Sequence, residues 1–187
     1  MAIVIAVVCI GLQAAGLEDA WRYDRVAVSQ GNYWLILSAN FVHLGWSHLL
    51  LNMAGLILIV MLVWSNFNAV TWIAITLLSS LAVGLGLYWR DPSIGWYVGF
   101  SGTLHGLIIA GTLADIRRYP VGAIVLLVLV VGKLGWEQLY GAMPGSEAAA
   151  GGAVVVNSHL YGAIAGACCG IALLTVQRLW PTSASQA

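Results

Sequence analysis

The chain has 187 residues, of which 61% are hydrophobic and only 7% are charged. Soluble domains usually carry charge on about a quarter of their residues, so this composition is typical of a membrane protein rather than of a water-facing domain. Seven basic residues balance seven acidic ones, which argues against nucleic-acid binding, because that function needs a basic surface.

Charge-free stretches predict the membrane helices, because a spanning helix needs about 20 apolar residues. The stretch 26–89 is long enough for two helices, interrupted at the polar segment Ser65–Asn68. We therefore predict an all-α fold, in which one membrane domain covers 1–187 and contains six transmembrane helices. In chain order, these helices cover about 1–16, 46–64, 69–89, 101–116, 120–138 and 158–179.

Tryptophans and arginines indicate where these helices end and how they are oriented. Trp64, Trp89, Trp136 and Trp180 fall near predicted helix ends, where tryptophan prefers the lipid interface. Arg117–Arg118 predicts a cytoplasmic connection by the positive-inside rule, and Arg178 lies on the same side. Both termini then face the cytoplasm.

Three long connections fall on the other side of the membrane, at 17–45, 90–100 and 139–157. The last of them is rich in glycine, alanine and serine from Gly141 to Asn157 and contains Pro144. This composition predicts a mobile flap rather than another helix.

Ser101 is the first candidate for chemistry, because it follows a connection and begins a predicted helix. A serine there lies among backbone N–H groups at the positive end of a helix dipole. Such donors suit a developing oxyanion. The alternative is a helix-capping serine beside glycines that only permit close packing.

The last predicted helix provides the partner for this serine. His159 is followed by Gly162, Gly166 and Gly170, a spacing that makes a smooth face for close helix packing. The Ser101 helix carries the matching pair Gly102 and Gly106. Pairing the two faces in register places Ser101 and His159 at a similar depth, so the imidazole is a candidate base for the hydroxyl. Neither helix offers a carboxylate, so we expect a dyad.

The second predicted helix adds polar groups to the same end of the bundle. His48 and Asn52 are four residues apart and therefore share a helical face. Both side chains donate hydrogen bonds, so they are candidates for an oxyanion hole, although interhelical hydrogen bonding is the simpler alternative. We expect His43, at the junction of connection and helix, to brace that connection.

Together these motifs resemble the rhomboid intramembrane proteases, a likeness that extends over nearly the whole chain. The resemblance implies a six-helix rhomboid-like bundle in which a Ser–His dyad cleaves transmembrane protein substrates, without a metal or other cofactor. It also implies a multi-pass protein of the bacterial inner membrane whose active site opens to the periplasm. The motifs are His43-x4-His48-x3-Asn52, Gly99-x-Ser101-Gly102 and His159-x2-Gly162-x3-Gly166. By resemblance, Ser101 and His159 form the dyad, and His48, Asn52 and the Ser101 N–H bind the oxyanion.

Two positions depart from the common rhomboid pattern. Trp34 is followed by Leu35 where the family often has Trp-Arg, and His105 stands where a tyrosine often stacks on the catalytic histidine. The string Ser-Gly-x-x-His-Gly and the compact size look most like the rhombosortase branch. That branch is associated with bacterial substrates ending in a Gly-rich motif, a hydrophobic helix and a basic tail.

Other uses of the polar residues remain open. Lys133 and Glu137 form an i,i+4 pair, which we expect to be an interfacial ion pair or a brace for the flap, with a role in substrate gating as the alternative. The four histidines (His43, His48, His105 and His159) allow a metal or haem protein, since imidazole is a frequent ligand. A non-catalytic rhomboid relative that binds client helices is a second alternative. A proton-coupled transporter is less favoured, since we expect no Asp or Glu in the middle of the membrane.

Overall fold

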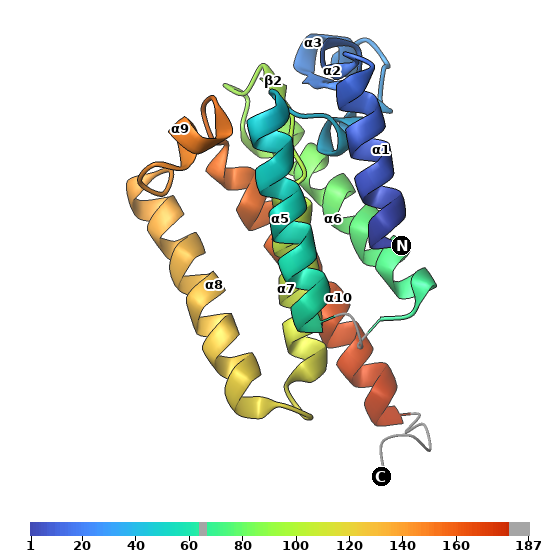
Figure 1. The fold of residues 1–187 in the computed structure, drawn as a ribbon, viewed down its shortest axis with the longest axis vertical. Coiled ribbons are helices and arrows are strands. Elements are labelled where there is room, and N and C mark those ends of the chain that lie inside the picture. Colours follow the sequence, from blue (N-terminus) through green and yellow to red (C-terminus); the bar gives the residue numbers. More distant parts are fainter. Residues whose placement is uncertain (64–66, 180–187) are drawn as a thin grey trace.

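The computed structural model describes residues 1–63 and 67–179. The fold is a bundle of helices with shorter elements gathered at one end (Figure 1). In chain order the elements are α1 (Ala2–Ala14), α2 (Glu18–Trp21), β1 (Tyr23–Asp24), α3 (Arg25–Ser29), α4 (Leu35–Ser38), the 3-10 helix η1 (Ala39–Phe41), α5 (Trp46–Val63), α6 (Ala69–Arg90), β2 (Trp96–Tyr97), α7 (Ser101–Asp115), α8 (Pro120–Tyr140), α9 (Ser146–Ala150) and α10 (Val156–Leu179).

Within the described residues, four helices are long and apolar enough to span a membrane: α5, α6, α8 and α10. Two of the six predicted spans are shorter helices, because α1 has 13 residues and α7 has 15. The count of six transmembrane helices is therefore a prediction that the helix lengths do not confirm. The polar break expected at Ser65–Asn68 falls partly outside the described residues, but α6 does begin after Asn68, whose side chain accepts a hydrogen bond from Thr71 N (2.8 Å).

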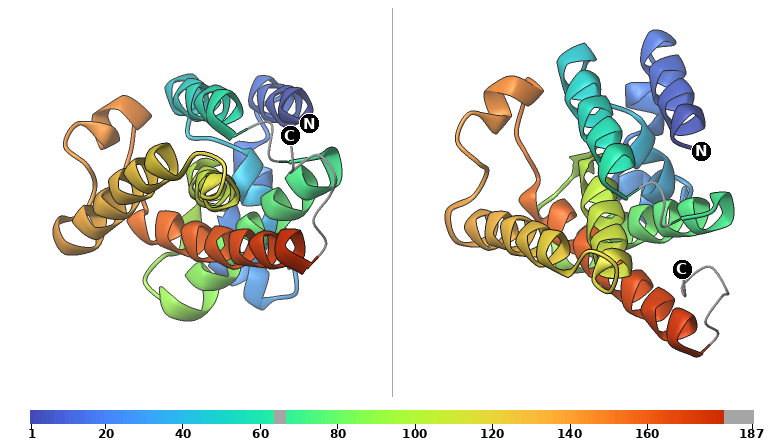
Figure 2. Two further views of the ribbon diagram at one scale, coloured as in Figure 1. Left: turned by 90° about the horizontal axis from the view of Figure 1, so that it is seen from below. Right: turned by 60° about the horizontal axis from the view of Figure 1, so that its bottom comes forward.

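The short helix α7 occupies the centre of the bundle, with α5, α6, α8 and α10 packed around it (Figure 2). Most of its side chains are buried. At about 1.5 Å per residue, its 15 residues rise about 22 Å, less than the roughly 30 Å of a bilayer's hydrocarbon core. Because other helices surround it, α7 does not have to span that core by itself.

A strand pair and a set of hydrogen bonds hold together the connections at the N-terminal end of α7. β1 pairs with β2 in antiparallel register, with Tyr23 opposite Tyr97. Arg25 reaches the C-terminal end of α6, where its guanidinium donates hydrogen bonds to the carbonyls of Leu87, Tyr88, Asp91 and Ile94 at 2.6–3.0 Å. Carbonyls at a helix end lack intrahelical partners, so a cation there satisfies them.

The flap predicted at Gly141–Asn157 contains a helix, which corrects the expectation that it has none. α9 covers Ser146–Ala150, and the glycines on either side, Gly145 and Gly151, have positive φ angles of 80° and 78°. Glutamate and alanine are good helix formers, so the Ser-Glu-Ala-Ala-Ala run makes one turn between two glycine breaks. The helix was not predicted because the prediction used the composition of the whole segment, in which this short run is a small part.

The connections are divided between the two ends of the bundle, and the orientation of these ends in a membrane stays a prediction. The α7–α8 connection with Arg117–Arg118 and the C-terminal end of α10 lie at one end, and the connections at 91–100 and 141–155 lie at the other (Figure 1). Trp89 and Trp136 are exposed near the ends of α6 and α8, as expected of interfacial tryptophans. Trp64 and Trp180 lie outside the described residues.

Candidate active site

The glycine faces of α7 and α10 lie against each other in the register that the sequence predicts. A Cβ added at Gly102 would meet Ser158 O at 2.7 Å, and one at Gly106 would meet Gly162 O at 2.8 Å. On α10, a Cβ at Gly162 or Gly166 would collide with the backbone of Gly102 or Gly106, respectively. The two backbones are therefore in direct contact, which only glycine allows here.

This packing brings Ser101 and His159 together. Ser101 Oγ lies 2.9 Å from His159 Nε2, and His159 is 5% exposed. Ser101 is the first residue of α7, and the first intrahelical hydrogen bond runs from Leu104 N to Phe100 O. The N–H groups of Ser101, Gly102 and Thr103 therefore precede the helix's own hydrogen bonds.

The segment leading into Ser101 is fixed on both sides. Gly99 N donates to Ala39 O (3.0 Å), and Tyr97 OH donates to Gly99 O (2.7 Å). Burial raises the pKa of Tyr97 to about 12, so the phenol keeps the proton that it donates. Gly99 has a φ of 125°, and a Cβ there would lie 2.7 Å from His48 Cε1. Glycine is thus required at this position both by the backbone and by the histidine ring.

A buried polar cluster, which the sequence analysis did not identify, anchors the first turn of α7. Thr103 Oγ1 donates to Asn40 Oδ1 (3.2 Å) and lies 2.8 Å from Ser80 Oγ. Asn40 Nδ2 in turn donates to Ser80 O (3.2 Å). All three side chains are buried. The sequence does contain one indication of this cluster. Asn40 lies in an apolar segment just ahead of the histidine motif, and a buried amide side chain needs hydrogen-bond partners.

The histidines and asparagine near α5 occupy two environments. His48 and Asn52 line the same cavity as Ser101 and His159, and Asn52 Nδ2 donates to His48 O (3.0 Å). His43 lies behind them, fully buried, with its ring edge-on to His48 at 5.1 Å. Burial lowers the pKa of His43 to about 3, so this ring is neutral. His43 braces the His48 ring by packing.

His105 stacks on His159, as its position four residues after Ser101 allows. The two ring centroids are 4.3 Å apart and the rings are inclined by 20°. His105 Nδ1 lies 2.7 Å from Ser101 O, and its Nε2 lies 3.0 Å from Lys133 Nζ. The imidazole thus takes the stacking place expected of a tyrosine and adds a polar contact on each edge.

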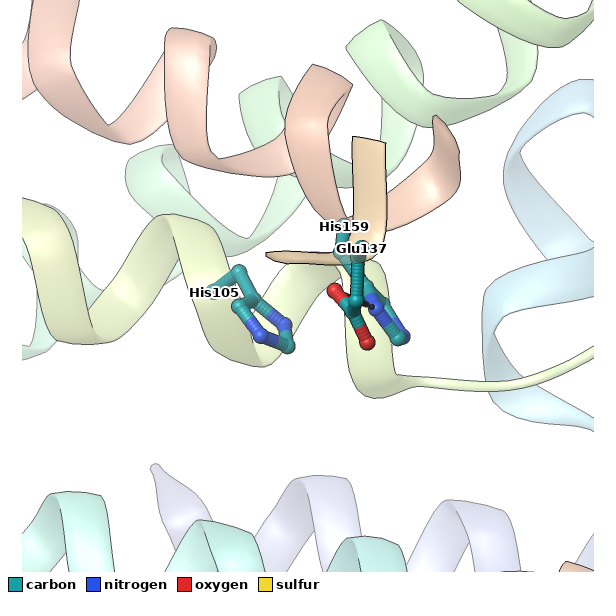
Figure 3. Close-up of side chains that lie close together, drawn as sticks. All are labelled: His105, Glu137 and His159. Atoms are coloured by element: carbon teal, nitrogen blue, oxygen red, sulfur yellow. Dashed lines mark hydrogen bonds and ion pairs between the residues drawn. The ribbon is translucent and has the colours of Figure 1, made fainter. Parts of the chain in front are cut away.

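A carboxylate from α8 reaches the same histidine, which corrects the expectation of a site without one. Glu137 Oε2 lies 2.9 Å from His159 Nδ1, and its Oε1 lies 2.7 Å from Lys133 Nζ. Figure 3 shows the Glu137 carboxylate against the His159 ring, with His105 beside them. The i,i+4 pair was correctly predicted, but the contact with His159 involves a third helix, and the periodicity of the sequence gives no sign of it.

These groups line a cavity of about 940 Å³ between α5, α7 and α8, with α9 and the segment 93–98 at one end. The polar atoms gather at that end. The remaining walls are apolar and include Leu51, Leu58, Ile108, Leu126 and Val130. A cavity with such apolar walls suits an apolar helical ligand.

The Rhomboid domain family matches residues 30–176. The chain belongs to the rhomboid family. Rhomboid proteins are generally intramembrane serine proteases that act on transmembrane substrates, and the apolar helices agree with a multi-pass membrane protein. No curated protein matches the sequence.

The match begins at residue 30, after the first predicted helix and part of the first connection. That connection does contain a Trp-Arg pair, at Trp21–Arg22 rather than at Trp34. The Trp21 and Trp34 rings pack edge to face at 5.5 Å, and the Arg22 guanidinium lies 5.5 Å from the centre of the Trp96 ring. The pair therefore ties the first connection to β2, close to the segment that leads into Ser101.

Proposed function

We propose that this rhomboid protein is an intramembrane serine endopeptidase with Ser101 as nucleophile and His159 as general base. The observation that supports this most directly is the 2.9 Å separation of Ser101 Oγ and His159 Nε2 at the end of an apolar cavity. A serine hydroxyl is a weak nucleophile until an adjacent base takes its proton. The cavity provides the apolar environment from which a transmembrane segment approaches.

The reaction follows from the positions of these groups. Ser101 Oγ attacks a peptide carbonyl of the substrate while His159 Nε2 takes the hydroxyl proton, and the imidazolium then gives that proton to the leaving amine as the C–N bond breaks. Water, deprotonated by the same imidazole, hydrolyses the acyl-enzyme and restores the hydroxyl. The Ser101 N–H, His48 and Asn52 stabilise the oxyanion of each tetrahedral intermediate.

The rhombosortase branch is our proposal for the substrate class. Substrates associated with that branch end in a Gly-rich motif, a hydrophobic helix and a basic tail, and we propose that this protein cleaves such a substrate near the periplasmic face. In this proposal the protein lies in a bacterial inner membrane, with the Ser101 end of the bundle towards the periplasm. Arg117–Arg118 at the opposite end supports this orientation by the positive-inside rule.

Labelling by a serine-directed fluorophosphonate tests the nucleophile and its base. The wild-type protein is expected to be labelled at Ser101, because His159 takes the proton as the hydroxyl displaces fluoride from phosphorus. Ser101→Ala and His159→Ala should both lose the label, as measured by in-gel fluorescence and mass spectrometry of the labelled peptide. Folded wild-type protein without label at Ser101 would contradict the proposal and favour a non-catalytic rhomboid that binds client helices.

Gly99→Ala tests whether the His48 ring must stay where it is. The new Cβ would press on His48 Cε1 and adopt a φ that costs about 1–3 kcal/mol for other residues. We expect labelling of Ser101 to slow by about 10- to 100-fold, because an error of about 1 Å in a catalytic group has effects of this size.

Gly95→Ala is the matched control for this variant, because a Cβ at Gly95, in the same connection, meets nothing within 4 Å. It should be labelled at the wild-type rate. If Gly99→Ala is labelled as fast as Gly95→Ala, the His48 ring can move without lowering the labelling rate of Ser101.

The metal-binding alternative has one observation in its favour. His105, Glu137 and His159 offer ligand atoms within 4.8 Å of one another. However, Lys133 Nζ lies 3.0 Å from His105 Nε2 and 2.7 Å from Glu137 Oε1, so an ammonium group occupies the place that a metal ion needs. His43 and His48 are not part of this cluster. Metal analysis of the purified protein tests this alternative directly.

A further inference from the structure

Glu137 is a buried carboxylate in a membrane helix, and its two oxygens have different partners. It is 2% exposed, and Oε1 accepts from Lys133 Nζ at 2.7 Å while Oε2 lies 2.9 Å from His159 Nδ1. A charge in this position is costly unless it is paired and hydrogen-bonded. Lys133 supplies the opposite charge, so one Glu137 oxygen remains for the imidazole.

The donors and acceptors of this cluster fit one assignment of protons. His159 Nε2 must accept the Ser101 hydroxyl proton if the serine is to attack, so its Nδ1 carries hydrogen and donates to Glu137 Oε2. Lys133 Nζ has donors only, so it donates to Glu137 Oε1 (2.7 Å) and to His105 Nε2 (3.0 Å), and its longer approach to His159 Nδ1 (3.4 Å) is not a hydrogen bond in this assignment. His105 Nδ1 then carries hydrogen and donates to Ser101 O.

The result is a closed ring of hydrogen bonds that begins at the Ser101 hydroxyl and returns to the Ser101 carbonyl. Every side chain in it has a partner at 2.7–3.0 Å. Both histidines are neutral in this assignment, and the lysine and glutamate charges cancel, so the ring as a whole is neutral. That is the form with the smallest cost in a low-dielectric site.

We propose that Glu137 is a positioning residue that orients His159 and holds it in the tautomer that serves as base, so that the site works as a Ser–His–Glu triad. This inference rests on the proposed function of Ser101 and His159. The carboxylate would act in two ways. It accepts the Nδ1 proton, which leaves Nε2 free for the serine, and its negative charge stabilises the imidazolium that forms in the transition state.

Lys133 has a supporting part in this arrangement. It fixes the carboxylate through Oε1 and balances its charge, while its side chain, 34% exposed, reaches the cavity. Because Glu137 and Lys133 both lie on α8, the base of the reaction depends on a helix that carries neither the nucleophile nor the imidazole. A purely structural ion pair would need no imidazole contact, yet Glu137 directs its second oxygen at His159.

The test compares Glu137→Gln, Glu137→Asp and Glu147→Gln by the rate of fluorophosphonate labelling in detergent, together with the thermal unfolding midpoint. Glutamine keeps the size of the side chain but removes the charge, whereas aspartate keeps the charge. Glu147→Gln makes the same chemical change at an exposed glutamate that accepts from Val154 N (3.3 Å). We expect Glu137→Gln to label on the order of 10⁴-fold more slowly than the wild type. Glu137→Asp should label at least about tenfold faster than Glu137→Gln, and Glu147→Gln should match the wild type.

Each outcome decides a separate point. Equal labelling of the wild type and Glu137→Gln would overturn the positioning role and leave the Ser–His proposal intact. Equal losses in Glu137→Gln and Glu137→Asp, or losses that follow the loss of folded protein, would assign Glu137 to helix packing and also overturn the role. An unlabelled but folded wild type would instead contradict the proposed function itself.

Discussion

Ser101→Ala is expected to leave a tail-bearing reporter uncleaved under conditions in which the wild-type protein cleaves it completely. The reporter is a periplasmic protein that ends in a Gly-rich motif, a hydrophobic helix and a basic tail. Without the hydroxyl, no acyl-enzyme forms, and the rate falls on the order of 10⁶-fold, as in other serine proteases that lose the nucleophile. Loss of the tail is measured by immunoblot and by mass spectrometry of the product's new C-terminus.

The matched control is Ser93→Ala, which removes another hydroxyl from the lining of the same cavity. It should cleave the reporter as the wild type does, because Ser93 is an exposed residue of the connection before β2. Cleavage that persists in Ser101→Ala would end the proposal of a serine protease. Cleavage of other transmembrane substrates, with this reporter left intact, would contradict the rhombosortase-type substrate and leave the chemistry standing.

The features that the sequence predicts well are those governed by local patterns. Apolar length and helix-breaking residues place the long helices within about two residues of their observed ends. The four-residue spacing of Gly162 and Gly166, matched by Gly102 and Gly106, predicts which faces of two distant helices meet and at what register. Glycine is informative here because it permits a backbone contact that no other residue allows.

The features that the sequence does not predict depend on contacts between helices without such a marker. Glu137 and Lys133 form a recognisable i,i+4 pair on α8, but nothing in their spacing indicates that His159, 22 residues further along, lies at the second carboxylate oxygen. A buried acidic residue in an apolar helix nevertheless indicates that a hydrogen-bond or charge partner lies nearby. The sequence analysis interpreted Lys133 and Glu137 as an ion pair at the membrane interface with no further partner, so it did not identify Glu137 as the third member of the candidate triad.

Gly162→Ala is expected to disrupt both the fold and the chemistry, because the added methyl group would collide with the backbone carbonyl of Gly102. The Gly102 carbonyl belongs to the first turn of α7 and, as a backbone group, cannot rotate away from the added methyl group, so the helices must separate. Overpacking costs about 1–3 kcal/mol and sometimes more, and we expect the upper part of that range here. The thermal unfolding midpoint in detergent measures this change.

The same separation would act directly on the active site. His159 precedes Gly162 by one turn on α10, and Ser101 directly precedes Gly102, so moving α10 away from α7 lengthens the 2.9 Å contact between Oγ and Nε2. A displacement of about 1 Å lowers the rate by about 10²-fold. We therefore expect Gly162→Ala to lose reporter cleavage even in the fraction of protein that stays folded.

Gly132→Ala on α8 separates this effect from a general intolerance of alanine in the membrane helices. A Cβ at Gly132 meets nothing within 4 Å, so this variant should keep its cleavage rate and unfold at or slightly above the wild-type temperature, because alanine favours the helix over glycine by about 0.5–1 kcal/mol. A Gly162→Ala protein that matches Gly132→Ala in both measurements would show that α7 and α10 do not approach backbone to backbone. The hydroxyl–imidazole contact, which depends on that approach, would then lose its structural basis.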